Sequence, residues 1–404
     1  MDGNRFNLEI MKEIGNAEVL VFDAIRQGKT LTDINSNIAV MDGSNGPVRV
    51  EVRGTLYGTN EVWGSSELVI RSSIDPSYVR ELVAWEQSSL EIHGGVITGK
   101  EAVTAFDSSR VQILGGDLSG FRDGMRIWHN SSLEMSGGSV SGQDDGIDVD
   151  DSGSLWITGG RISGANDGLK VKGYSTTTLA SGVISGQDDG ISVADDAVVR
   201  ISPSDAMVSG AIGVKVIDNG LAEIYGGQIS GDVWAVLAED DSQINLFGGD
   251  IQGTVATTGG TVNIVGAELT LSEDGRTVTG QTLDGSELNI PIHVDGEGTI
   301  NLIATYYGDA NLDGEFNSLD FVSAFVGVEY EDSVIRNSTW ADGDWNGDGE
   351  FDSSDMVLAF QFGGYEQGPR AATSIRTVPE PTSWALLSVG VLAMFCRTLR
   401  KSRR

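Results

Sequence analysis

Cysteine is almost absent from this chain of 404 residues, because Cys396, close to the C-terminus, is the only one. A disulfide framework is therefore excluded, and packing, backbone ladders or metal ions must hold the fold. Basic residues are also scarce, with 26 lysines and arginines against 59 aspartates and glutamates and a net charge of -33. Because such a chain repels phosphates, we expect no nucleic-acid partner. Divalent cations suit it better.

Two kinds of apolar segment are missing as well. Residues 1–20 contain no basic stretch followed by an apolar one, so they do not read as a signal peptide. We favour an incorrect start site as the reason, and we expect residues 1–35 to be an uncertain region that holds part of an early repeat. The apolar run at residues 384–396 has about 13 residues, fewer than the roughly 20 that span a bilayer.

The middle of the chain repeats one motif, Gly-Gly-x-(Ile/Val/Leu)-(Ser/Thr)-Gly, at intervals of 21 to 24 residues. Its clear copies and its variants start at Gly94, Gly115, Gly137, Gly159, Ser181, Asp205, Gly226 and Gly248. A period near 22 with short β-rich units is typical of a solenoid. The glycines suit tight corners, where φ is often positive.

Each repeat contains three short runs with strand character. The first alternates apolar and polar residues, as in 133–135 and 155–157, the second centres on the aliphatic residue of the motif, and the third holds an aliphatic pair such as Ile147 and Val149. Stacking turn on turn, about 4.8 Å apart, aligns the inward side chains in aliphatic columns. We therefore predict a mainly β fold, with a right-handed parallel β-helix solenoid over residues 36–303.

A column of aspartates recurs at 22-residue intervals, each directly before a glycine: Asp123, Asp145, Asp167 and Asp189. The Asp-Asp-Gly pieces at 144–146 and 188–190 are similar to fragments of the polygalacturonase family, which hydrolyses glycosidic bonds with paired carboxylates on a β-helix. Pectate lyases offer a second analogy, in which a basic residue abstracts a proton. The candidate catalytic residues under these resemblances are Asp144, Asp145, Asp148, Asp167 and Lys170.

A structural role explains the same column. Asp-Gly is common in turns, where Asp bonds its own backbone and Gly adopts a positive φ, and a motif repeated in successive rungs argues against a unique catalytic site. The polygalacturonase pattern also requires a His-Gly and an Arg-x-Lys on nearby rungs, whereas His93-Gly94 lies two rungs from Asp144. We favour a rod without a clear catalytic site and leave enzymatic activity open. Trp156, in a polar column, either stacks on a sugar or packs against a loop.

Two loops after the repeats share one spacing of metal-ligating residues. Oxygen donors stand at positions 1, 3, 5, 9 and 12 and glycine at position 6, as in EF-hand calcium loops, while residue 7 offers its carbonyl. The two ligand sets are Asp309, Asn311, Asp313, Glu315, Asn317 and Asp320, and Asp344, Asn346, Asp348, Glu350, Asp352 and Asp355. Because carboxylates and carbonyls suit the hard cation Ca²⁺, we expect two calcium sites.

A short amphipathic helix is expected after each loop, and none before it. This duplicated loop-and-helix pattern resembles the type I dockerin module over about residues 306–363, and we place that small α-helical domain at residues 304–363. The resemblance implies a calcium-folded domain that binds a cohesin. A calcium-stabilised spacer between rod and anchor fits the residues equally well. Residues 364–377 then form a polar linker.

The last part of the chain joins a short motif, Pro379-Glu380-Pro381, to a hydrophobic run and a basic end. This order resembles the PEP-CTERM sorting signal of exported bacterial proteins, over residues 378–404. The resemblance implies export, transient membrane contact through this segment, processing by an exosortase near the motif, and delivery to the cell surface, outer membrane or extracellular matrix.

We therefore predict an exported, calcium-binding β-helix protein that displays a surface for glycans, such as a polysaccharide, or for protein partners. The alternative is a secreted polysaccharide lyase or glycoside hydrolase that acts on acidic polysaccharide through the rung aspartates.

Overall fold

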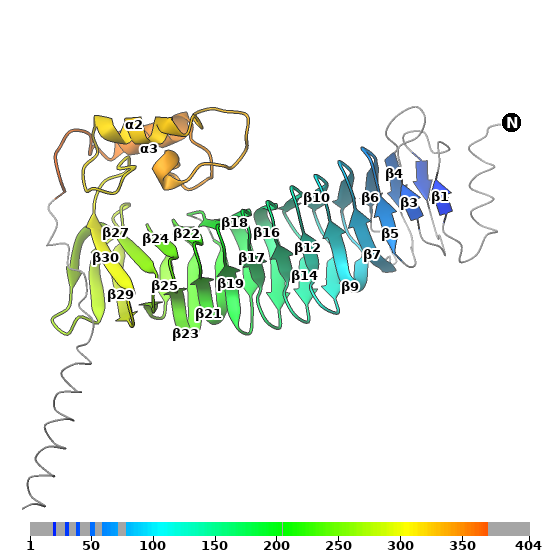
Figure 1. Ribbon diagram of the computed structural model, residues 1–404, viewed down its shortest axis with the longest axis horizontal. Helices are drawn as coiled ribbons and strands as arrows, with labels where there is room; N and C mark the ends of the chain where they lie inside the picture. Colours follow the sequence, from blue (N-terminus) through cyan, green and yellow to red (C-terminus); the bar gives the residue numbers. More distant parts are fainter. Residues whose placement is uncertain are drawn as a thin grey trace, which may run out of the picture.

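The computed structural model describes residues 19–21, 29–31, 38–40, 49–52, 59–71, 78–203 and 205–370. They form a rod of parallel strands with a small helical module along one side (Figure 1). The predicted mainly β solenoid is confirmed. Most of residues 1–35, residues 371–377 of the predicted linker and the whole sorting segment with Pro379, Glu380 and Pro381 lie outside the described residues. Within the described part, no helix is long and apolar enough to cross a membrane.

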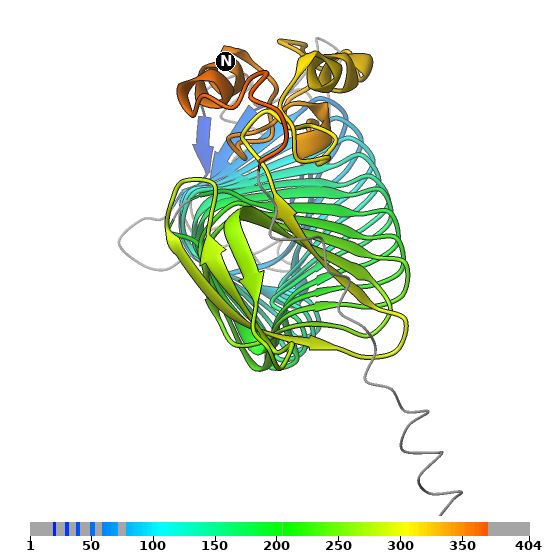
Figure 2. The ribbon, with the colours of Figure 1, turned by 90° about the vertical axis from the view of Figure 1, so that its left-hand side faces the viewer.

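Three columns of parallel strands build the rod, and Figure 2 shows their coil nearly end-on. The first column contains β2 (Lys29–Leu31), β4 (Arg49–Val52), β6 (Glu67–Ile70), β8 (Ser89–Ile92), β10 (Arg110–Ile113), β13 (Ser132–Met135), β16 (Ser154–Gly164), β18 (Thr176–Ser185), β20 (Val198–Ile201), β22 (Leu221–Ile224), β24 (Gln243–Leu246), β27 (Thr261–Leu271) and β30 (Thr299–Ala304). The second contains β11 (Asp117–Gly120), β14 (Ser139–Gly142) and β25 (Asp250–Gln252), together with parts of β16, β18 and the long strands β7 (Tyr78–Ala84), β9 (Val96–Ala105), β21 (Met207–Val216) and β23 (Gln228–Ala238). The third contains β1 (Val19–Val21), β3 (Ile38–Val40), β5 (Asn60–Val62), β12 (Met125–Ile127), β15 (Ile147–Val149), β17 (Leu169–Val171), β19 (Asp189–Val193), β26 (Val255–Thr257) and β29 (Glu287–Val294), with the ends of β7, β9, β21 and β23.

The register follows the sequence repeat. Leu133 pairs with Val111 on one side and Leu155 on the other, and Ile147 lies between Met125 and Leu169. These inward side chains belong to one continuous aliphatic core along the rod. The predicted columns are therefore confirmed, while the right-handed sense and the domain bounds stay predictions.

Two corners of each turn use left-handed backbone conformations. The second glycine of the motif does so as predicted, with φ of 109° at Gly116 and 83° at Gly138. A corner before the first strand was not predicted, and it uses polar residues such as Asp107 (φ 64°), His129 (φ 55°) and Asp151 (φ 62°). The next rung supplies an acceptor, because the Asp107 N–H lies 3.1 Å from His129 Nδ1 and the His129 N–H 3.4 Å from Asp151 Oδ2. Short polar side chains tolerate this conformation best.

An antiparallel addition interrupts the coil near its C-terminal end. Strand β28 (Thr277–Gln281) pairs antiparallel with β27 and with β29. This feature was not predicted. Its signal in the sequence is a pair of Asp-Gly turns, at Asp274-Gly275 and Asp284-Gly285, next to the alternating buried and exposed residues of β29.

The module contains α2 (Ser318–Val326) and α3 (Ser353–Gln361), each beginning within the last three positions of one of the two predicted metal loops. Asn317 and Asp352 cap the helices, because their side chains accept hydrogen bonds from Leu319 N and Ser354 N. A 3₁₀ turn, η1 (Trp340–Asp342), precedes the second loop, where no helix was expected.

Candidate functional site

The predicted aspartate column lies where the third-column strands begin, and its members are buried. Carboxylates of this column accept hydrogen bonds from the backbone of the next rung: the Asp145 N–H lies 3.4 Å from Asp123 Oδ1, and the Asp167 N–H lies 3.2 Å from Asp145 Oδ1. These two carboxylates therefore join neighbouring turns, which is a structural task.

The glycine after each aspartate is required for a different reason from the one predicted. Gly146 is not in the left-handed region, so a positive φ does not explain it. A Cβ built on Gly146 would instead lie 2.3 Å from the carbonyl oxygen of Gly168 in the next rung. Close approach of two backbones selects glycine here.

Cations from the outer face of the third column neutralise the aspartates. Arg126 lies 3.2 Å from Asp123 and 3.3 Å from Asp148, and Lys170 lies 3.3 Å from Asp145 and 3.7 Å from Asp167. Four of the five candidate catalytic residues are thus engaged in ion pairs between or within rungs: Asp145, Asp148, Asp167 and Lys170. The fifth, Asp144, is exposed.

The pKa values of this column are raised, for two different reasons. Burial, followed by the Asp189 and Asp145 carboxylates, raises the pKa of Asp167 to about 7. Burial raises the pKa of Asp189 to about 6. Burial alone would lower the pKa of Lys170, but the carboxylates of Asp145 and Asp167 outweigh it and raise that pKa above its usual value. The raised pKa favours the protonated form of Lys170 and disfavours a role as a proton-abstracting base.

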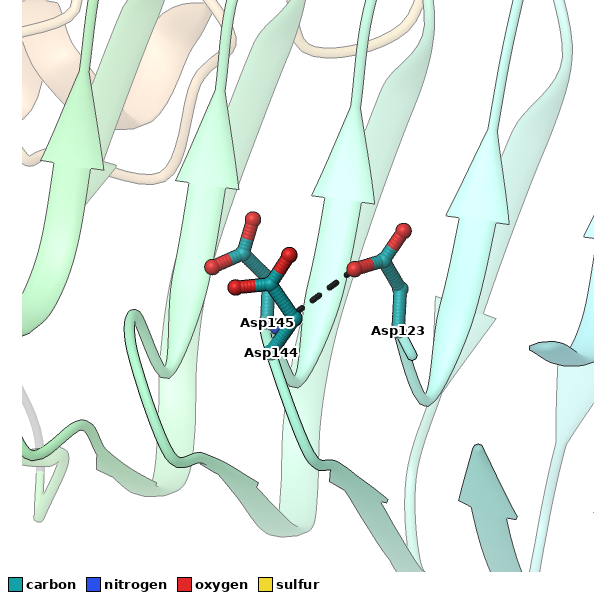
Figure 3. Close-up of side chains that lie close together, drawn as sticks. All are labelled: Asp123, Asp144 and Asp145. Atoms are coloured by element: carbon teal, nitrogen blue, oxygen red, sulfur yellow. Dashed lines mark hydrogen bonds between the residues drawn. The ribbon is translucent and has the colours of Figure 1, made fainter. Parts of the chain in front are cut away.

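Asp123, Asp144 and Asp145 lie side by side at the start of two rungs (Figure 3). Each offers one oxygen within 4.8 Å of the other two, the closest group of three carboxylates found among the described residues. Asp123 already has Arg126 at 3.2 Å. The trio is thus a charge-compensated part of the column.

The first loop of the module wraps its backbone around one buried carboxylate. Asp309 Oδ2 accepts a hydrogen bond from Gly314 N at 2.8 Å, and Oδ1 accepts one from Asp313 N at 3.1 Å. At the far end of the loop, Asp320 accepts hydrogen bonds from Asn317 N at 2.7 Å and from Asn311 N at 3.4 Å. Backbone N–H groups of the loop thereby hold the residues at predicted positions 1 and 12 in place.

The second loop repeats this geometry 35 residues later. Asp344 Oδ2 accepts from Gly349 N at 2.8 Å and Oδ1 from Asp348 N at 3.0 Å, while Asp355 accepts from Asp352 N and Asn346 N, both at 3.0 Å. The glycines at position 6 also match, with φ of 92° at Gly314 and 91° at Gly349. The remaining predicted ligands, Asn311, Asp313, Glu315, Asn317, Asn346, Asp348, Glu350 and Asp352, lie on the loops between these ends and are partly or fully exposed.

The carboxylates at the loop ends are buried with few opposing charges. Asp309, Asp320, Asp344 and Asp355 have no exposed surface. Burial raises the pKa of Asp309 and of Asp355 to about 7, and neighbouring carboxylates add to both shifts. Such anions fit a site for a cation, which would restore their ionised form.

The second loop also lies against the rod. Arg200 and Glu223 of the rod are buried beside Asp344, with Arg200 Nε 3.5 Å from Glu223 and 4.0 Å from Asp344. Glu223 accepts a hydrogen bond from Trp340 N at 3.2 Å, and Tyr225 donates its hydroxyl to the Asp344 carbonyl at 3.0 Å. The module and the rod therefore share one polar, fully buried contact.

Aromatic rings complete this contact. Trp340 stacks on Phe247 of the rod with centroids 4.1 Å apart, and Phe247 stacks on Tyr225 at 4.8 Å. Sequence reasoning missed this interface. Its one signal is that Tyr225 and Phe247 precede the Gly-Gly motif where earlier rungs have smaller side chains such as Leu114 and Ser136.

Two family models match parts of the chain. Residues 65–249, within the rod, match the family described as "Periplasmic copper-binding protein (NosD)", and this match covers less than half of the chain. Residues 377–401 match the PEP-CTERM protein-sorting motif. The protein is exported. It resides in the cell envelope or at the surface, and its motif implies processing by an exosortase-type enzyme. No curated protein and no solved structure matches the chain.

Proposed function

We propose that this exported protein is a display rod of the cell surface or extracellular matrix, and that its dockerin-like module binds two calcium ions. The duplicated loop geometry carries the proposal. Both loops aim the same backbone N–H groups at a buried aspartate in position 1 and at a second buried aspartate in position 12. Such buried carboxylates are costly unless a cation neutralises them.

Calcium fits these loops better than copper, which the matched family description names. All predicted ligands are carboxylate, amide or carbonyl oxygens, which suit calcium, whereas copper sites favour imidazole and sulfur ligands. The chain has three histidines. His93 contacts Glu91, His129 lies 3.3 Å from Asp107, and His293 stacks on Trp234, so each has its own surroundings.

Calcium titration of the full-length protein by calorimetry tests this proposal. We expect two binding events in the wild type and none in the double variant Asp309→Ala/Asp344→Ala. The matched control is Asp274→Ala/Asp295→Ala, which removes two exposed carboxylates from turns at the end of the rod. If calcium uptake is the same in both double variants, the assignment of the loops is wrong.

A cohesin-like domain is the partner that we propose for the module. The second loop faces the rod, so the outer surface of α2 and α3 is left accessible, and it carries apolar side chains. Leu319, Val322 and Val357 are 63%, 62% and 65% exposed. Leu319→Asp/Val357→Asp should abolish binding to a type I cohesin domain in calorimetry while calcium uptake stays unchanged. Cohesin binding that survives this change would exclude the surface.

Cleavage of acidic polysaccharide remains the second candidate function, favoured by one observation. A carboxyl group with a pKa of about 7, such as Asp167, resembles the general acids of glycoside hydrolases. Against it stand the burial of Asp167 and its place in the ladder of rungs. Reducing ends or unsaturated uronides released from polygalacturonate, and lost in Asp144→Asn, would favour the enzyme. Asp144 suits this test because it is exposed, so its substitution should disturb the fold little.

A further inference from the structure

A cleft of about 120 Å³ opens where the first-column face of the rod emerges from under the module. Its floor is formed by the outward side chains of β13 and β16, and its far wall is the loop at residues 335–336 of the module. Glu134 and Trp156 are neighbours in register on the floor, and Arg110 lies at the rim on β10. The cleft is distinct from both metal loops and from the aspartate column.

Arg336 belongs to the far wall of this cleft. Its guanidinium lies 3.2 Å from the centre of the Trp156 ring, so the predicted packing of Trp156 against a loop is the arrangement observed. The second metal loop holds the segment at residues 336–338 in place, because Arg336 N donates to Glu350 at 2.9 Å and Ser338 N donates to the Gly349 carbonyl at 3.0 Å. The Arg336 guanidinium thereby covers one face of the Trp156 indole, and the polar groups around the indole are available to bind a ligand.

The charged groups of the cleft are poorly paired compared with the rest of the rod. In the part of the chain that the structure describes, the side chains of Arg110 and Glu134 make no hydrogen bond or ion pair. Elsewhere on the lateral faces, cations and anions pair rung to rung, as Lys215 does with Glu239 at 3.1 Å. Burial lowers the pKa of Arg336, Glu134 opposes this shift and Arg110 adds to it, so the three charges act on one another.

We propose that this cleft binds one neutral sugar ring of a surface or matrix polysaccharide, an inference that rests on the display function proposed above. Donors from Arg110 and Arg336 and acceptors from Glu134 suit the adjacent hydroxyls of a pyranose, and Trp156 supplies an apolar edge. Both signs of charge are present, and the chain as a whole carries -33, which disfavours an acidic polymer. The volume is well below the roughly 300–1,000 Å³ of enclosing pockets, so a single ring enters while the rest of the chain stays in solvent.

Calorimetry of the full-length protein with calcium tests this site, using tetrasaccharides of glucose, mannose and galactose and, for comparison, tetragalacturonate. At least one neutral tetrasaccharide should bind, and Arg110→Gln and Glu134→Gln should each weaken that binding at least tenfold. Arg161→Gln is the matched control, because Arg161 is exposed on the same strand β16 but belongs to the second column. It should leave the affinity unchanged.

Three outcomes would overturn the proposal: no neutral tetrasaccharide binds, binding survives in both cleft variants, or only tetragalacturonate binds. The calcium titration separates this failure from failure of the proposed calcium module. A protein that takes up two calcium ions and binds no neutral sugar lacks the sugar site but keeps the calcium module. Unchanged calcium uptake in Arg110→Gln and Glu134→Gln shows that their module is folded, and an unchanged β circular-dichroism signal shows that their rod is folded.

Discussion

The aspartate column of the rod contains buried carboxylates whose negative charge is unfavourable there. At Asp167, burial raises the pKa to about 7. The folded protein therefore binds this proton more tightly than the unfolded chain does. The stabilisation that the bound proton provides is fully present below the unfolded value of 3.8 and is lost as pH rises to about 7.

Asp167→Asn should remove this pH dependence, because the amide is never ionised. We expect the variant and the wild type to have similar free energies of unfolding near pH 4, and the variant to be more stable at pH 8 by up to about 4 kcal/mol. Urea unfolding at a series of pH values measures the difference, and the aspartates of the metal loops cancel in the comparison. Asp144→Asn, at an exposed position, is the control. A variant that loses stability at pH 8 would contradict the sign.

Gly146 tests the close approach between rungs. Gly146→Ala places a methyl group 2.3 Å from a backbone oxygen that no side-chain rotation can move. We expect a loss of about 1–3 kcal/mol in the free energy of unfolding, as for other overpacked sites. Denaturant midpoints measure it, with Ser152→Ala at an exposed corner as the control. Equal midpoints for both variants would mean that the neighbouring turn moves away without cost.

Individual elements were predictable to the extent that their signals repeat. The columns of strands followed from the 22-residue period and the alternation of apolar residues, because each rung restates the same pattern. The corner at Asp107, His129 and Asp151 was missed because its residues are of two different types and share only the ability to adopt a positive φ. The hairpin of β28 was missed because it occurs once.

The candidate sites likewise differ in how far they could be predicted from the sequence. The turns of the two loops could be predicted from spacing, since the residues of such a loop lie close together in the sequence, while metal binding by them stays a prediction. The contact between Arg200, Glu223 and Asp344 could not, because it joins residues more than 100 positions apart, with the Glu223 to Trp340 bond spanning 117 residues. Arg200 is in register with the polar residues Thr178 and Glu223 on neighbouring first-column strands. Nothing in the sequence there distinguishes it from an exposed arginine.

Arg200→Met tests this contact between elements. The change leaves the carboxylates of Glu223 and Asp344 buried without their cation, which typically costs about 3–5 kcal/mol when one partner of a buried pair is removed. We expect the module to detach from the rod, so that amide exchange at residues 337–349 and at Tyr225 becomes faster. The control is Arg161→Met on the exposed face of β16. Unchanged exchange in Arg200→Met would mean that aromatic stacking alone holds the module.

At the scale of the whole molecule, two cores meet at one interface. The aliphatic core runs along the rod, and a separate aromatic core fills the module and reaches the rod through Tyr225 and Phe247. The strand ladder of the rod contains none of the loop residues, so its hydrogen bonds do not depend on calcium. The module has two short helices and buries the four loop-end carboxylates, so we expect its fold to depend on a cation that neutralises them.

Removing calcium from the full-length protein should therefore unfold one part and spare the other. With a chelator, we expect the helical circular-dichroism signal to disappear and the β signal to remain, while a hydrophobic dye binds the newly exposed surface around Phe247. Asp309→Ala/Asp344→Ala should give the same spectrum without chelator and should not respond to it. If chelation removes helical and β signals in a single transition, rod and module form one cooperative unit, because the buried contact at Arg200 then transmits the loss of calcium into the rungs beneath it.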